Sequence, residues 1–167
     1  MMIRDATPDD AQMLAHVHVR AWQEAYVGLL PDVEIAKRDL TYRFKLWSRL
    51  IAEGQSRIAV SPDVGFAQVG PQRDQVLLDA GYRDELYSFY VLRPAYGTGT
   101  AQALLRHALG RGGQPFSALV VEGNARACGF YEKIGMRHLE TRTEAMGQFR
   151  FSERAYVCDD PHHILHN

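Results

Sequence analysis

The chain has 167 residues, of which 46% are hydrophobic and 23% charged, and its formal net charge at pH 7 is −1. This length suits one ordinary domain, and the composition is that of a globular protein, which excludes fibrous and disordered classes. The near-zero charge gives no electrostatic reason to expect a nucleic acid or an anionic membrane as a partner.

Targeting signals and metal-site patterns are missing from the sequence. The start "MMIRDATPDD" does not resemble a signal peptide, and no apolar run is long enough to span a bilayer, so we expect a cytoplasmic protein. Cys128 and Cys158 form no CxxC pair and have no histidine at zinc-ligand spacing. We therefore expect two reduced thiols and no metal.

The first half of the chain is predicted to hold a strand, two helical regions and a hairpin. A short strand in "MIRDA" precedes Thr7, Pro8 and Asp10, whose pattern starts a helix that runs to about Tyr26. A second helical region covers Val33 to about Ile51 and is broken near Thr41. The segments "RIAV" and "VGFAQV" then indicate a hairpin, and Gly70 to Asp84 is predicted to be a loop.

The second half alternates strands and helices. The strand "ELYSFYV" is followed by a glycine turn, an amphipathic helix, the strand "SALVV" and a helix from Asn124 to the stop at Gly135. Two strands near Met136–Thr143 and Phe149–Cys158 come last, and residues 159–167, with three histidines, are expected to be a frayed tail. This order predicts a single α/β domain over 1–167, with a mixed, twisted sheet of six or seven strands flanked by about four helices.

The stretch "VLRPAYGTGTAQALL" predicts an anion site. Gly97 and Gly99 allow a tight turn between strand and helix, and the first amides of that helix have no partner of their own. Such amides, aided by the helix dipole, bind phosphate groups. The turn lacks the lysine of an NTPase phosphate loop, and Gln102 replaces the third glycine of a dinucleotide fingerprint.

A second motif points to one nucleotide. The stretch "VVEGNARACGFYEKIGM" places Asn124, Ala127, Tyr131 and Gly135 in fixed spacing. Together with "ELYSFYVLRPAYGTGTAQALL" it resembles the GCN5-related N-acetyltransferase (GNAT) superfamily, whose motifs look like Q/R-x-x-G-x-G/A and N-x-x-A-x-x-x-Y-x-x-x-G-F/M. The resemblance covers Glu85 to Met136 and implies a GNAT fold, acetyl-CoA as co-substrate and an amine as acceptor.

The resemblance also implies a set of cofactor-binding residues. Amides of the glycine turn would hold the pyrophosphate, and the strand before it would bind the pantetheine arm and the acetyl carbonyl. One departure is Tyr96, which stands where the family has Gln or Arg, so that the turn's amides, helped by Arg93, would bind phosphate without that side chain. The implied residues are Val91, Leu92, Tyr96, Gly97, Thr98, Gly99, Thr100, Ala101, Asn124 and Tyr131.

Acetyl transfer to an amine needs a base, an oxyanion donor and an acid. Holding an alkyl amine neutral at pH 7 costs roughly 4–5 kcal/mol, which makes a base useful. By the resemblance, Glu85 is the first candidate for that base, with Glu122 or a water chain as alternatives. Tyr131 would donate a proton to sulfur, and the amide of Val91 or Leu92 would meet the oxyanion.

The acceptor side is represented by the first helix. His18, Trp22 and Tyr26 lie on neighbouring turns, and this H-x-x-x-W-x-x-x-Y helix with its "GLLP" loop resembles one group of bacterial GNAT proteins. The three side chains are candidates for an acceptor pocket in which aromatic rings hold an amine cation. Packing in the hydrophobic core is the alternative.

The resulting hypothesis is an N-acetyltransferase that acts by direct transfer in a ternary complex on a primary amine, with a small molecule favoured. No cysteine occupies an obvious nucleophile position, which disfavours an acetyl-enzyme. The alternatives are a non-catalytic acyl-CoA sensing module, an enzyme acting on a peptide N-terminus or lysine, and an acyl group larger than acetyl. Exposed sheet edges allow a homodimer.

Overall fold

A computed structural model describes all 167 residues. The strands are β1 (Arg4–Asp5), β2 (Arg57–Ser61), β3 (Gly65–Pro71), β4 (Asp84–Val91), β5 (Phe116–Val121), β6 (Arg137–Met146) and β7 (Phe149–Cys158). The helices are α1 (Ala11–Tyr26), α2 (Asp32–Lys37), α3 (Leu40–Glu53), α4 (Gln75–Asp79), α5 (Thr100–Leu109), α6 (Ala125–Lys133) and α7 (His162–His166). Two 3-10 turns, η1 (Pro8–Asp10) and η2 (Arg93–Ala95), complete the fold.

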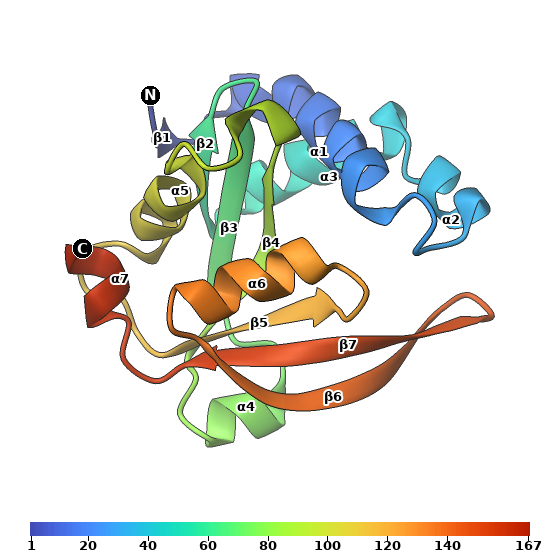
Figure 1. Cartoon of the computed structure of the whole chain (residues 1–167). Helices are drawn as coiled ribbons and strands as arrows, with labels where there is room; N and C mark the ends of the chain where they lie inside the picture. The colour runs from blue at the N-terminus through green and yellow to red at the C-terminus, as the bar shows by residue number, and fades with distance from the viewer.

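All seven strands belong to one sheet, in the order β1-β2-β3-β4-β5-β7-β6 (Figure 1). Every neighbouring pair is antiparallel except β4 and β5, which are parallel. That pairing covers only three residue pairs, from Asp84 with Phe116 to Leu86 with Ala118. Beyond Leu86, β4 stays with β3 and β5 stays with β7, so the two strands separate. The predicted fold class, a single α/β domain with a mixed sheet, is confirmed.

Each face of the sheet carries its own hydrophobic core. On one face, α5 and α6 pack over the sheet through residues such as Leu104, Leu105 and Tyr131. On the other face, α1 and α3 pack through residues such as Leu14 and Trp47. The helical spacing of these apolar positions explains why each helix buries a single stripe. The separation of β4 from β5 lies between these two layers.

Two local predictions need correction. The helical region after Pro31 breaks at Arg38–Asp39, before the predicted Thr41, because the side chain of Asp39 accepts a hydrogen bond from the amide of Tyr42 and caps α3. The predicted loop Gly70–Asp84 contains α4, which begins where Asp74 accepts from the amide of Leu77. Burial of Leu77 holds this short helix in place.

The expected frayed tail is also wrong. Residues 162–166 form α7, and Ile164 is buried in the core that also contains residues of α5 and α6. The Nε of Arg106 donates to the carbonyl of Ile164 (3.1 Å), and Nε2 of His163 lies 2.7 Å from the carbonyl of Ile134. His163 therefore links α7 to the end of α6, while the side chains of His162 and His166 are exposed. No helix is both long and apolar enough to cross a membrane, and no cluster of three metal-ligating side chains is found.

Docking of α7 can be tested by Ile164→Ala. Removal of a buried isoleucine side chain leaves a cavity, so we expect the free energy of unfolding to fall by about 2 kcal/mol. Urea denaturation would measure this loss. The control is Val76→Ala, because Val76 is largely exposed and should change stability little. Equal stability of both variants would contradict the packing of α7 seen here.

Candidate active site

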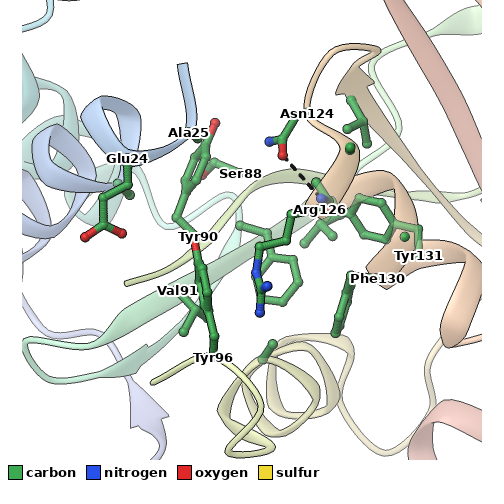
Figure 2. Close-up of a pocket in the computed structure, with 18 of the residues that line it drawn as sticks. Glu24, Ala25, Ser88, Tyr90, Val91, Tyr96, Asn124, Arg126, Phe130 and Tyr131 are labelled. Atoms are coloured by element: carbon green, nitrogen blue, oxygen red, sulfur yellow. Dashed lines mark hydrogen bonds between the residues drawn. The ribbon is translucent and has the colours of Figure 1, made fainter. Parts of the chain in front are cut away.

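The separation of β4 from β5 opens a cleft of about 1050 Å³. Its walls come from α1, β4, the β4–α5 turn, β5 and α6, so the two predicted motifs face each other across it (Figure 2). Nineteen of the 30 lining residues are hydrophobic, which suits the long apolar part of a ligand. The cleft is therefore built by the same residues that carry the sequence motifs.

The exposed edge of β4 offers one free backbone donor near its end. The amide of Leu92 donates to the carbonyl of Val64 (2.8 Å) across the antiparallel β3–β4 pair. Because successive amides of a strand point to opposite sides, the amide of Val91 points away from β3 and into the cleft. Of the two predicted oxyanion donors, Val91 is thus available, whereas Leu92 is engaged and its side chain is buried in the core with α1.

The glycine turn has the geometry of an anion site. Gly97 and Gly99 have φ values of +76° and +84°, which favour glycine. The amides of Gly97, Gly99, Ala101 and Gln102 donate no hydrogen bond within the chain, and nothing lies within 4 Å of a Cβ built on either glycine. These amides are therefore unpaired at the start of α5 and available to a ligand.

The two threonines of the turn, Thr98 and Thr100, have side chains that contact each other. Their hydroxyl groups lie 2.7 Å apart, and neither residue lines the cleft. Thr98 also donates to the carbonyl of Ala95, and Thr100 is buried. Thr98 and Thr100 therefore brace the turn from behind, while the neighbouring glycine amides face the cleft.

Asn124 and Tyr131 form the wall opposite β4. The Oδ1 of Asn124 accepts from the amide of Ala127 (3.2 Å) and caps α6 (Figure 2). Tyr131 lies on the inner face of α6, where burial, followed by the neighbouring Tyr90 and Cys128, raises its pKa far above the ordinary value. Its hydroxyl has no hydrogen-bond partner in the chain. The phenol is therefore a protonated donor without a competing partner.

Only one of the three predicted acceptor residues reaches the cleft. Tyr26 lines it, with its hydroxyl 3.1 Å from that of Tyr90. Trp22 stands behind, and its indole Nε1 donates to the same Tyr90 hydroxyl (3.1 Å). His18 is 5% exposed and accepts from Nε1 of Trp47 (3.2 Å). Burial, and then the nearby Arg43 cation, hold the pKa of His18 well below its usual range, so it is a neutral core residue.

The aromatic group behind Tyr90 contains a buried cation that the sequence did not reveal. Arg43 is 4% exposed, and its Cζ lies 4.6 Å from the centre of the Trp22 ring. The Nε and Nη2 atoms have no hydrogen-bond partner, and burial lowers the pKa of Arg43 to about 10. The faces of aromatic rings therefore provide its main stabilisation.

The carboxylates are arranged differently from the prediction. Glu85 is buried outside the cleft, where Nη2 of Arg73 donates to its Oε2 (2.6 Å) and the amide of Arg73 to its Oε1 (3.2 Å). Glu122 is also absent from the cleft lining and lies 3.4 Å from Arg154. Neither candidate base belongs to the cleft lining that contains Tyr131.

Glu24 of α1 is the one carboxylate that lines the cleft (Figure 2). Its Oε2 accepts from the amide of Arg93 (2.9 Å), and its Oε1 lies 3.3 Å from Nε of Arg20. Sequence reasoning missed this residue. The available signal was its spacing, because Ala21, Glu24 and Ala25 form the i, i+3, i+4 stripe of α1 that faces the cleft.

At the outer part of the cleft, Tyr96 meets α6. The guanidinium Cζ of Arg126 lies 3.4 Å from the centre of the Tyr96 ring, and both residues line the cleft (Figure 2). Arg93 and Lys133 add two further cationic side chains to the lining. The free amides and these cations fit a ligand with a diphosphate, and the free edge of β4 fits an amide-containing arm. The residues present thus suit a coenzyme A thioester.

Comparisons with known proteins agree with this geometry. The Acetyltransferase (GNAT) family matches residues 17–136. A curated relative, the uncharacterized N-acetyltransferase YuaI of Bacillus subtilis, is 29% identical over 108 residues, which cover 62% of this chain and 59% of that protein. The chain therefore matches less than two thirds of that relative's length.

Solved structures share the fold. The yncA acetyltransferase structure from Salmonella typhimurium, with its cofactor acetyl-CoA, has a TM-score of 0.67 at 16% identity and covers 95% of this chain and 93% of that chain. The PaiA N-acetyltransferase of Thermoplasma acidophilum, in complex with coenzyme A, has a TM-score of 0.62 at 17% identity and covers 92% and 96%. Because the family match spans more than half of the sequence and includes both motifs, this chain belongs to the acetyltransferase (GNAT) family.

Proposed function

We propose that this protein transfers an acetyl group from acetyl-CoA to a primary amine of a small-molecule acceptor, by direct attack in a ternary complex. The observation that carries the proposal is one cleft that joins the free amides of the glycine turn, the free amide of Val91 and the unpartnered hydroxyl of Tyr131. The relatives solved with acetyl-CoA or coenzyme A support the choice of co-substrate. A cytoplasmic location and a homodimer stay predictions.

In this proposal, different residues bind different parts of the co-substrate. The amides of Gly97, Gly99 and Ala101 hold the diphosphate, since each hydrogen bond to a charged oxygen contributes roughly 1.5–3 kcal/mol. The edge of β4 hydrogen-bonds the pantetheine arm in the manner of an added strand. Asn124 and Tyr131 border the arm from α6. The thioester then lies between Val91 and Tyr131.

The chemistry follows from the donors at that point. The neutral amine attacks the thioester carbonyl carbon, and the amide of Val91 stabilises the negative charge that develops on the carbonyl oxygen. The new C–N bond forms and the C–S bond breaks. Tyr131 gives its proton to the departing thiolate, and the proton lost by the amine restores the phenol through solvent or a base.

We propose Glu24 as the group that removes the amine proton, directly or through one water. It is the one carboxylate in the lining, and its contact with the amide of Arg93 places it two residues beyond Val91 along the same edge of the chain. Glu85, held by Arg73 outside the cleft, serves as an ion-pair partner in this proposal.

The acceptor end of the cleft is covered, which favours a small amine over a peptide. A Cβ built on Gly123 would lie 2.9 Å from Leu29, so the loop after α1 lies against the β5–α6 turn. Leu29 and Gly123 both line the cleft, so an extended peptide that enters at this end would need their contact to open.

The overall proposal predicts acceptor-dependent thiol release. Titration calorimetry should show binding of acetyl-CoA, and a panel of small amines should then release free coenzyme A faster than peptides of similar basicity. Binding without release on any amine would favour a sensing module. Release on peptides alone would favour the protein-directed enzyme, and no binding of acetyl-CoA would refute the proposal.

The proton-donor role predicts the effect of Tyr131→Phe. Loss of the hydroxyl should lower kcat by roughly 100-fold or more, because general acid catalysis typically contributes that much, while calorimetry should show unchanged affinity for acetyl-CoA. Since the raised pKa keeps the phenol protonated, wild-type kcat should not fall between about pH 7 and about pH 9.5. The matched control is Tyr42→Phe, at an exposed tyrosine outside the cleft.

The base assignment predicts opposite results for two glutamates. Glu24→Gln should lower kcat by roughly 100-fold at pH 7, and part of the rate should return at higher pH, where the free amine deprotonates without help. Glu85→Gln should leave kcat within a few fold and lower thermal stability, because the partner of Arg73 loses its charge. A large kcat loss for Glu85→Gln alone would reverse the assignment.

A further inference from the structure

The contact between Tyr96 and Arg126 joins the two walls of the cleft. Tyr96 closes η2, directly before the glycine turn, and Arg126 belongs to the first turn of α6. The Cζ of Arg126 lies 3.4 Å from the ring centre, the separation of two stacked planes. Figure 2 shows the arginine reaching from α6 toward Tyr96. A residue from the second motif thus lies beside the turn of the first.

The stack leaves the hydrogen-bonding groups of Arg126 available. A guanidinium presents its N–H groups in its own plane, whereas stacking uses only its face. Arg126 forms no ion pair or hydrogen bond within the chain, and the one carboxylate of the cleft, Glu24, is engaged with Arg93 and Arg20. Five unpaired donors are therefore held over Tyr96, the residue that precedes Gly97, in the same cleft as the free amides of the turn.

We propose that Tyr96 and Arg126 form a phosphate clamp, in which the Tyr96 ring positions the Arg126 guanidinium against the diphosphate of the bound acyl-CoA. The inference rests on the proposed co-substrate. It gives the aromatic Tyr96 a task at the position where the related motif has Gln or Arg: the cation comes from the opposite wall and the ring orients it. Arginine suits this task because its planar fork binds two phosphate oxygens at once.

The clamp is tested by titration calorimetry with three ligands: coenzyme A, dephospho-coenzyme A, which lacks the 3′-phosphate, and pantetheine, which lacks all phosphates. We expect Arg126→Gln to weaken both nucleotides by about 10- to 100-fold and to leave pantetheine unchanged. Arg126→Lys should recover only part of the affinity, because lysine lacks the planar fork. The control is Arg111→Gln, which removes one exposed positive charge outside the cleft.

The position of Tyr96 is tested separately. Tyr96→Leu should weaken both nucleotides while the charge of Arg126 is retained, whereas Tyr96→Phe should bind like the wild type because it keeps the ring. Both residues are partly or fully exposed, so the variants should fold, and thermal unfolding would verify this.

Each result of these titrations corresponds to a different role of Arg126. A loss for coenzyme A that disappears with dephospho-coenzyme A would assign Arg126 to the 3′-phosphate and overturn the diphosphate clamp. An equal loss for pantetheine, or unchanged affinity for every ligand, would overturn the clamp as well. If the wild-type protein binds no coenzyme A, the proposed function itself fails, which is distinct from a failure of the clamp.

Discussion

The short parallel pairing of β4 with β5 is the constraint on which the site depends. Three residue pairs join the strands up to Leu86, and the remaining edge of β4 is left without a partner on that side. If the pairing continued, the amide of Val91 would donate its hydrogen bond to β5 and the cleft would close. Because unpaired backbone groups are costly when buried, this edge is stabilised by an open cleft or by a ligand that pairs with it.

Helices α1 and α6 place functional side chains on either side of this free edge of β4. On the α6 side stand the cap of Asn124 and the buried phenol of Tyr131, and on the α1 side stand Tyr26 and Glu24. The α1 wall is joined to β4 by the hydrogen bond that Trp22 donates to Tyr90 and by the hydrogen bond between the hydroxyls of Tyr26 and Tyr90. One helix therefore supplies both a stripe of the core and a face of the cleft, which explains why its aromatic residues divide between packing and the site.

The sequence predicted features that depend on neighbouring residues, and it failed for contacts between segments that are far apart in the chain. The turn at Gly97 and the cap at Asn124 follow from residues within a few positions, so both could be placed in advance. The partner of Glu85 is Arg73, which lies in a segment read as a loop, and the 3.4 Å contact of Arg126 crosses the cleft. Such pairings need the tertiary arrangement. His18 shows the same limit, since its helical spacing suited a pocket and a core equally.

Tyr26 and Tyr90 form a wall of the cleft that also affects the protonation state of an amine bound there. Burial raises the pKa of Tyr26 and of Tyr90, so both phenols are neutral and provide no countercharge for an ammonium ion. Behind them, the Arg43 cation lacks a carboxylate partner and raises the electrostatic cost of a second positive charge nearby. Both effects favour the neutral form of an amine that enters from this side. The wall would thereby lower the amine pKa, and the proton would be left to the one carboxylate in the lining, Glu24.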